Sequence, residues 1–367
     1  MNCTTNHPQS AQFAAAGLPT LIGSLPLSDH SEALDLILAH TPEIPLWPQL
    51  PGNPDEGMLQ QFSEGLAGIR KEDGRTFFAA DDPGLAEEML HFFEDYLALE
   101  EAPATPPARF TVRRELAAGL YLLAERAPSL DKAVAFKGQI TGPFTLLTGL
   151  KDQAQRLAYY NPELKDMVVK GLAGKAGWQT RMLAAAGKPV LTFIDEPALA
   201  GLGSSAFISI DLKELAGEIA EVTAAIHASG GLAGVHVCAN TDWSLLLPPA
   251  AGVDIISFDA HGYFDRFISD RGQVLDFLAR NGIIAWGIVP TGSAEKVAAE
   301  TVDSLVDRWE EQARTLGGAE IDLGEILNRT LITPSCGTGS LPPEMAVRVL
   351  ELTAGTSRVL RARYLAG

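Results

Sequence analysis

Cysteine, basic residues and long apolar runs are scarce in this sequence, and each shortage excludes a class of protein. The only cysteines among its 367 residues are Cys3, Cys238 and Cys336, so a disulfide framework is excluded and a reducing compartment is expected. No segment approaches the roughly 18 consecutive apolar residues of a membrane-spanning helix, and the N-terminus lacks the basic and apolar regions of a secretory signal. The sequence therefore predicts a cytoplasmic protein with no membrane partner.

Basic residues are outnumbered by acidic ones. Lysine and arginine total 28 against 46 aspartate and glutamate residues, which gives a net charge of −18. Such a charge repels both the phosphate backbone of a nucleic acid and the anionic surface of a membrane. Nucleic acids and lipid surfaces are therefore excluded as partners, and we expect a small-molecule substrate.

Short apolar, β-rich runs alternate with amphipathic helical patterns along the chain. Eight such runs lie at residues 18–23, 44–47, 133–138, 190–194, 233–237, 254–258, 283–288 and 330–333. Apolar residues recur at helical spacing within residues 31–39, 85–99, 164–186, 212–229 and 294–315. This alternation is typical of βα units with a parallel sheet.

The number of runs predicts a single (β/α)8 TIM barrel over residues 17–367. Residues 1–16 are small and polar, which indicates a flexible tail, and the gap between residues 47 and 133 predicts an insertion after the second strand. An open, doubly wound sheet is the alternative. It lacks support because no G-x-G-x-x-G follows an early strand.

Residues with chemically useful side chains follow the predicted strands at their C-terminal ends. In chain order they are Ser24, Lys137, Asp195 and Glu196, His236 and Cys238, Asp259, and Cys336. The C-terminal ends of barrel strands form the active-site face, so the placement itself predicts a site.

His236 and Cys238 are two residues apart on one predicted strand, so their side chains point to the same side. An isolated His-x-Cys pair is more often a core histidine beside a buried thiol. Cys336, in a glycine-flanked loop after another strand, favours a Zn²⁺ site across the barrel mouth instead. Asp259 is expected either to complete the ligand shell or to orient the histidine from outside it.

Ligands spread over several strands are typical of catalytic zinc, whereas structural zinc sites usually use close sequence pairs. Zinc held by two thiolates lowers the pKa of an incoming substrate thiol and presents it as a nucleophilic thiolate. Asp195 and Glu196 add adjacent acids at the end of a strand. One anchors a substrate ammonium or accepts a proton, or the pair caps the next helix; we expect Asp195 to be the functional acid.

Several segments together resemble the catalytic C-terminal barrel of cobalamin-independent methionine synthase. That family belongs to a superfamily that also holds uroporphyrinogen decarboxylase and the methylcobamide:thiol methyltransferases. The resemblance is carried by residues 21–26, 137–143, 194–199, 236–238 and 334–337. The His-x-Cys with a late cysteine is its most specific part.

The resemblance implies a site and a reaction. His236, Cys238 and Cys336 would bind the catalytic Zn²⁺, with Asp259 where the synthases have a glutamate ligand. The backbone of Ile22, Gly23 and Ser24, together with Asp195, would hold the amino acid part of a homocysteine-like thiol. Methyl transfer to the sulfur would give methionine, so a zinc-dependent methyltransferase is expected.

Departures from the family pattern concern the methyl donor and the ammonium site. The tryptophan that stacks on folate is missing near Gly149, and the histidine after the seventh strand has no match in residues 286–292. A methylcorrinoid, carried in one version of this hypothesis by a corrinoid protein, is therefore expected ahead of methyl-folate. The glutamate that binds the substrate ammonium has two candidate counterparts, Asp55 and Glu56.

Two other functions remain as alternatives. A decarboxylase related to uroporphyrinogen decarboxylase needs a basic pocket, but no arginine precedes Arg70. A non-catalytic zinc barrel that binds a corrinoid protein would fit the missing donor residues equally well.

Overall fold

The computed structural model describes residues 13–72 and 74–365. Within those residues, no helix combines the length and the hydrophobicity needed to cross a membrane. Most of the predicted tail, residues 1–12 with Cys3, lies outside the described residues. The tail ends earlier than predicted, because Ala15 is buried and Phe13 packs beside it against the hydrophobic side chains of the strands.

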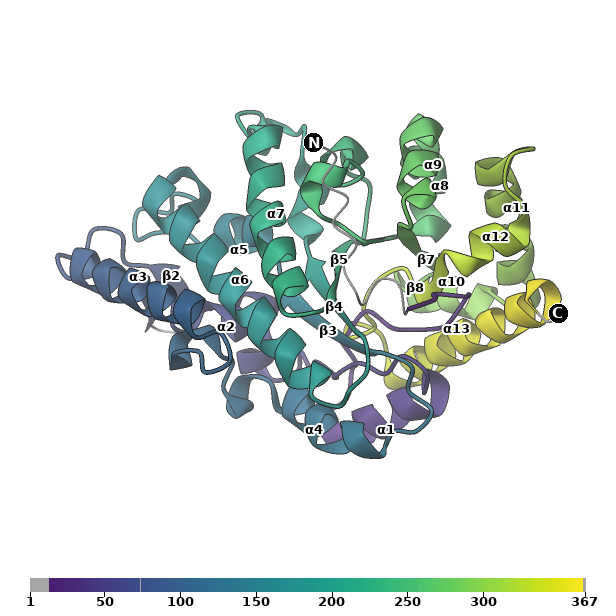
Figure 1. Ribbon diagram of the computed structural model, residues 1–367, viewed down its shortest axis with the longest axis horizontal. Coiled ribbons are helices and arrows are strands. Elements are labelled where there is room, and N and C mark those ends of the chain that lie inside the picture. The colour runs from purple at the N-terminus through teal and green to yellow at the C-terminus, as the bar shows by residue number, and fades with distance from the viewer. Residues whose placement is uncertain (1–12, 73, 366–367) are drawn as a thin grey trace.

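A curled parallel sheet of six strands forms the centre of the molecule (Figure 1). In spatial and chain order the strands are β3 (Phe136–Thr141), β4 (Val190–Asp195), β5 (Leu232–Val237), β6 (Ile255–Phe258), β7 (Ile283–Val289) and β8 (Thr330–Pro334). Every residue of these strands is buried, as expected for parallel strands covered on both faces. The last six predicted strands are therefore confirmed.

The first two predicted strands, at residues 18–23 and 44–47, do not form regular strands. They make isolated parallel bridges to the two outer strands of the sheet, Pro19 with Ile332 of β8 and Leu46 with Lys137 of β3. A third bridge joins the two segments through Ser24 and Gln49. Proline lacks the N–H that a ladder needs, and both segments contain proline, which explains why the ladders stop at single bridges.

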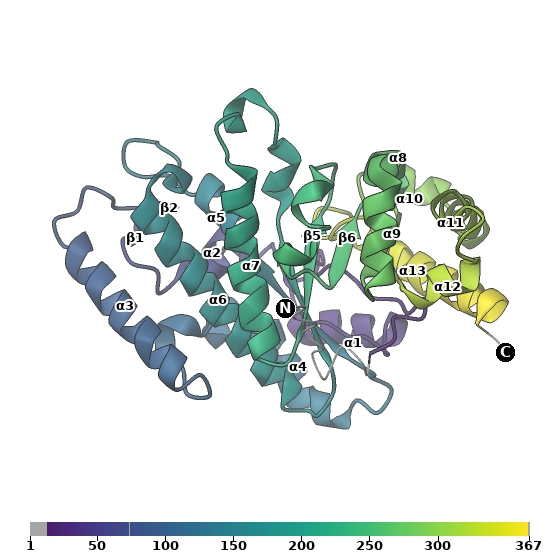
Figure 2. The ribbon, with the colours of Figure 1, turned by 45° about the horizontal axis from the view of Figure 1, so that its top comes forward.

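Helices lie around the outside of the curled sheet (Figures 1 and 2). Those that accompany the sheet are α1 (His30–His40), α5 (Pro143–Gly149), α6 (Pro162–Ala184), α7 (Leu212–Ala228), α8 (Ala260–Phe267), α9 (Arg271–Ala279), α10 (Ala294–Ala299), α11 (Val302–Gly317), α12 (Leu323–Asn328) and α13 (Pro343–Tyr364). The helix predicted over 294–315 is divided into α10 and α11. Thr301 caps α11 and shares a reciprocal capping box with Ser304, so a new helix begins there.

The predicted insertion after residue 47 contains helices and a small hairpin. Its elements are α2 (Met58–Ser63), β1 (Ile69–Glu72), β2 (Arg75–Phe78), α3 (Leu85–Glu101) and α4 (Ala118–Arg126). Helix α3 lies at the edge of the molecule in both views. The start of the insertion reaches the C-terminal end of the sheet, because the Thr141 hydroxyl at the end of β3 donates to the Met58 carbonyl over 2.7 Å.

Candidate metal centre and adjacent cavity

Three of the four predicted metal ligands come together at the C-terminal end of the sheet. His236 belongs to β5, Cys238 follows that strand directly, and Cys336 follows β8. One ligand atom from each, a ring nitrogen and two Sγ atoms, lies within 4.8 Å of the other two. His236 and Cys238 are two residues apart, so their side chains point to the same side of the sheet. Because the sheet is curled, the loop after β8 places Cys336 next to them.

The histidine ring is held in a defined orientation. Its Nδ1 shares a 2.9 Å hydrogen bond with the Ser257 hydroxyl, and His236 and Ser257 are register partners on β5 and β6. Its Nε2 is buried and has no hydrogen-bond partner among the described residues. Burial, and secondarily the positive charge of Lys137, lowers the pKa of His236 to about 3. A neutral imidazole with one orphan nitrogen is the form that binds a metal.

The two thiols interact directly. The hydrogen bond between them lowers the pKa of Cys238 and raises the pKa of Cys336. Both side chains are only partly buried. Gly337, next to Cys336, lies so close to Ser24 that a Cβ there would meet the serine Oγ at 2.1 Å. A larger residue at this position would therefore require the Ser24 side chain to move.

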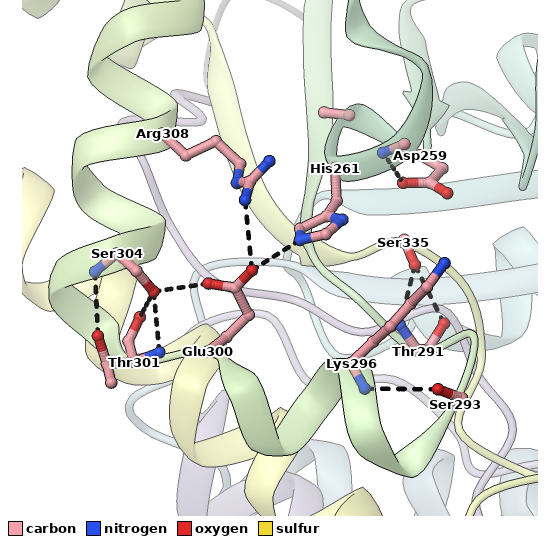
Figure 3. A network of polar contacts seen from close by, with 12 residues as sticks. Asp259, His261, Thr291, Ser293, Lys296, Glu300, Thr301, Ser304, Arg308 and Ser335 are labelled. Carbon is pink, nitrogen blue, oxygen red and sulfur yellow. Dashed lines mark hydrogen bonds and ion pairs between the residues drawn. The ribbon is translucent and has the colours of Figure 1, made fainter.

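The structure does not bring Asp259, the fourth predicted ligand, to the other three. Asp259 is the N-cap of α8, and its Oδ1 accepts a 2.8 Å hydrogen bond from the Gly262 N–H (Figure 3). It is absent from the cluster of ligand atoms formed by the described residues. Asp259 lies between the end of β6 and the start of α8. The first N–H groups of a helix have no partner within the helix, so the Asp259 carboxylate binds one of them.

The two adjacent acids at the end of β4, Asp195 and Glu196, differ in their hydrogen bonding. Asp195 lines a cavity beside the cysteines, and its Oδ1 is buried without a hydrogen bond in the described structure. Glu196 points toward α5 and accepts hydrogen bonds from the Phe144 N–H (2.9 Å) and from the Thr145 N–H (2.8 Å) and hydroxyl (2.6 Å). Gly142 makes this possible, since a Cβ there would lie 2.2 Å from the Glu196 carboxylate. Asp195 is thus the acid available for a ligand.

Burial dominates the electrostatics of Asp195. It raises the pKa of the carboxyl group to about 7, while the positive charge of Lys137 acts in the opposite direction. An acid with this pKa changes its charge near neutral pH, which suits a group that binds a cation or accepts a proton.

The cavity beside the cluster has a volume of about 360 Å³, which suits a small metabolite. Its wall combines the metal-site residues with backbone and side chains from four separate loops: Ile22, Ser24, Gln49, Pro51, Glu56, Met58, Asp195, Pro197, His236, Cys238, Cys336, Gly337, Gly339 and Ser340. Ile22 and Ser24 therefore line it as predicted. Gly23 does not, because the place of its missing Cβ faces Gln49 and Gln139.

Of the two candidates for an ammonium-binding acid, only Glu56 lines the cavity. Its buried carboxylate is held by His30 Nε2 at 2.6 Å and by the Leu50 N–H at 2.9 Å. Asp55 instead pairs with Lys71 at 2.7 Å near the surface. The sequence analysis did not find Gln49 or Met58. Gln49 carries a signal that was overlooked, since it closely follows the second predicted strand.

A network of charged side chains lies beside Asp259 (Figure 3). Glu300 accepts hydrogen bonds from His261 at 2.8 Å, Ser304 at 2.6 Å and Arg308 at 3.4 Å. His261 comes from α8, whereas Ser304 and Arg308 come from α11. Glu300 therefore ties the start of α8 to α11, which is a structural role.

No protein-family model matches this chain, and no curated protein matches it either. One similar solved structure concerns inhibition of the pneumococcal virulence factor StrH and its recognition and hydrolysis of N-glycans, with 12% identity, coverage of 94% of this chain and 83% of that chain, and a TM-score of 0.47. Another is the GH113 β-mannanase AaManA from Alicyclobacillus acidocaldarius in complex with ManMIm, with 14% identity, coverage of 68% and 78%, and a TM-score of 0.40.

The comparisons do not bear out the methyltransferase class expected from the sequence, and that class is not retained. One of the two solved structures is described by N-glycan hydrolysis and the other as a mannanase. Their activity does not pass to this chain either, because one fold hosts many unrelated reactions.

Proposed function

We propose that His236, Cys238 and Cys336 hold a zinc ion and that the adjacent cavity binds a small thiol that carries an ammonium group. One observation carries the proposal: Nε2 of His236 is buried without a partner in the described structure, and a ring nitrogen of this histidine lies within 4.8 Å of two cysteine sulfurs. A buried nitrogen without a partner is costly, and a metal ion is the partner that two neighbouring sulfurs indicate.

The donor set fits zinc. One imidazole nitrogen and two sulfurs are the soft and borderline ligands that zinc prefers, and three protein ligands leave a position for substrate. Bound zinc would lower the pKa of a substrate thiol, so that the sulfur is a thiolate at neutral pH. Ser257 serves this arrangement by holding Nδ1, which leaves Nε2 directed to the metal.

Other residues of the cavity would bind the rest of the thiol substrate. The carboxylate of Asp195, free of hydrogen bonds at Oδ1, suits an ammonium group. Ile22 and Ser24 line the same cavity. The lining residues include neither lysine nor arginine. A homocysteine-like thiol meets these requirements.

The proposal extends to the fold. We infer a (β/α)8 barrel in which residues 18–23 and 44–47 occupy the first two strand positions. Support comes from their bridges to β8 and β3, and from a buried cluster with members from both segments, from the residue directly before β3 and from the other five strands: Ala15, Leu18, Ile44, Ala135, Leu191, Phe193, Leu232, Ile255, Ile283, Ala285 and Leu331. Kinship with the zinc barrel of cobalamin-independent methionine synthase belongs to the same proposal.

Glycoside hydrolysis and a decarboxylase of the uroporphyrinogen type fit the cavity less well. A glycosidase needs two carboxyl groups free to act on the sugar. Here Glu56, the second acid of the cavity, is bound by His30 and the Leu50 N–H. A decarboxylase for a polycarboxylate needs basic groups, which the lining residues lack.

The test is the metal content of protein purified without added zinc, followed by replacement with Co²⁺ and titration with homocysteine. The proposal expects one metal per chain and a change in the cobalt absorption bands when the thiol binds. A chain that takes up no metal, or a metal spectrum that no thiol changes, would contradict it.

The proposal names a thiol and leaves its reaction partner open. Methylcobalamin, a methylcorrinoid protein and methyl-folate, the donors considered from the sequence, are therefore tested for binding to the thiol-loaded protein. Tight binding of a corrinoid protein without turnover would favour the alternative of a non-catalytic zinc barrel.

A further inference from the structure

The two thiols of the cluster lie against each other at the wall of the cavity. Cys238 directly follows β5 and Cys336 follows β8, and β6 and β7 lie between these strands in the sheet. Their Sγ atoms lie within 4.8 Å of each other and share a hydrogen bond. Both side chains are partly exposed, and both line the cavity. A small solute that enters the cavity therefore reaches the two sulfurs together.

This placement suits the formation of a disulfide. The sulfurs of a disulfide are about 2.05 Å apart, so the two Sγ atoms have to approach each other by no more than about 3 Å. Both cysteines lie beyond the last residue of their strands, so the approach breaks no strand ladder. A disulfide that forms in a reducing compartment is usually transient and serves catalysis or redox sensing.

We propose that peroxide converts Cys238 and Cys336 into a reversible disulfide within one chain, and that this disulfide keeps metal out of the site. One thiol gives two electrons to the peroxide and becomes a sulfenic acid, and a water molecule leaves. The other thiol then attacks the sulfenic sulfur, which forms the S–S bond and releases the oxygen as a second water molecule. Dithiothreitol restores both thiols by thiol–disulfide exchange.

The disulfide and the metal exclude each other for a chemical reason. A sulfur binds metal as a thiolate, and in the disulfide neither sulfur is one, so His236 alone remains of the three ligands. A metal bound by both sulfurs likewise occupies the electron pairs with which they attack peroxide. This exclusion rests on the proposed function, whereas the formation of the disulfide depends only on the contact between the two sulfurs.

The experiment exposes chelator-treated protein to hydrogen peroxide and maps its peptides without reduction. Cys3→Ser is the parent protein, so that Cys238 and Cys336 are the only thiols present. The expected result is a cross-link between the peptides that contain Cys238 and Cys336, in a protein that runs as a single chain on a non-reducing gel. Both free thiols should return after dithiothreitol. Separate sulfinic acids on the two cysteines, or a cross-link between chains, would overturn the proposal.

Cys238→Ser and Cys336→Ser in the same parent are the matched controls. Each retains one thiol and lacks the second thiol that attacks the sulfenic acid. Dimedone, which traps sulfenic acids, should therefore label both variants strongly and the parent weakly. Equal labelling of the parent and the variants would show that the two sulfurs do not react with each other, and the inference would be wrong.

Zinc separates the two parts of the inference. With free zinc at about ten times its dissociation constant, oxidation of the parent should slow about tenfold, because only the metal-free fraction reacts. The oxidised protein should take up no Co²⁺ until it is reduced, and oxidised protein that still binds Co²⁺ would overturn the exclusion. A cross-link that forms equally fast with zinc, in a reduced chain that takes up no metal, would instead overturn the proposed function and leave the disulfide in place.

Discussion

The C-terminal end of the sheet has two regions that are chemically opposite. Around β4, β5 and β8, the buried polar atoms Asp195 Oδ1 and His236 Nε2 have no hydrogen-bond partner in the described structure. Around β6 and β7, the carboxylates of Asp259 and Glu300 are occupied by Gly262, His261, Ser304 and Arg308. The difference lies in the acids: Asp195 keeps an unpaired oxygen that suits a ligand, whereas the carboxylates of Asp259 and Glu300 hold elements of the chain together.

The comparison teaches that residue type alone does not separate the two regions. Both contain a histidine and an aspartate at the end of a strand or within three residues after it. The difference is that the helix start beside Asp259 offers N–H donors, and Glu300 offers His261 an acceptor. The Nε2 atom of His236 and the Oδ1 atom of Asp195 have no such partner in the described structure.

The largest effect is expected from replacing Cys336, which should abolish metal binding in the region around β4, β5 and β8. Replacing a residue that merely supports a metal ligand weakens metal binding about 10- to 100-fold. Cys336→Ser removes a proposed ligand itself, so its loss of metal affinity is expected to be larger. Zinc content after dialysis against a chelator measures the effect. Cys3→Ser, which alters the cysteine outside the described residues, is the control and should retain its metal. Equal metal content in both variants would exclude Cys336 as a ligand.

Glu196→Gln should cost stability without affecting the metal. An amide has one acceptor oxygen in place of two, so at least one of the donors from Phe144 and Thr145 would stay buried and unpaired. The expected loss is about 2 kcal/mol of the free energy of unfolding, measured by urea titration. Asp195→Asn is the companion variant. A larger loss of stability in Asp195→Asn than in Glu196→Gln would reverse the roles assigned to the two acids.

The pH dependence of stability should report on Asp195. Burial raises its pKa to about 7, above the roughly 3.9 of an unfolded aspartate, so the folded protein holds a proton that the unfolded chain releases between these values. The stabilising contribution is therefore complete below about pH 4 and is lost as the pH rises through about 7, by up to about 1.4 kcal/mol per pH unit. Urea unfolding across this range, with metal loading held constant, should give a flatter slope for Asp195→Asn than for the native chain. Parallel slopes would contradict the assignment.

The smallest effect is expected at Glu300. Glu300→Gln weakens the acceptor for His261 and Arg308, which should lower the free energy of unfolding by about 1 kcal/mol and leave metal content and thiol binding unchanged. Thermal unfolding and zinc analysis of the same preparation measure both properties. Loss of metal in this variant would mean that the two regions are coupled and that the comparison drawn between them is wrong.

The sequence predicted a substantial part of the fold. Apolar runs located the six strands from β3 to β8, and helical periodicity located α1, α3, α6 and α7 within a few residues. Such patterns are local, and so they can be read from neighbouring residues. The first two apolar runs were predicted as regular strands, but they contain prolines and form only single bridges to the sheet.

The pairing of His236 with Cys238, two of the proposed metal ligands, was also predictable, since strand periodicity fixes the side to which both point. The joining of Cys336 to them depended on the curl of the sheet, which brings β8 within reach of β5. The roles of Asp195, Glu196 and Asp259 depended on nearby helix starts, because a carboxylate turns to whichever N–H groups its neighbours leave unpaired.

The sequence by itself determined which residues stand at the ends of strands and which of them can bind a metal or a cation. Only the tertiary structure decided which of these side chains are occupied by the protein and which are left free for a ligand. The physical reason is that a polar group in the interior must find a partner, and whether that partner is another part of the chain depends on contacts between distant segments.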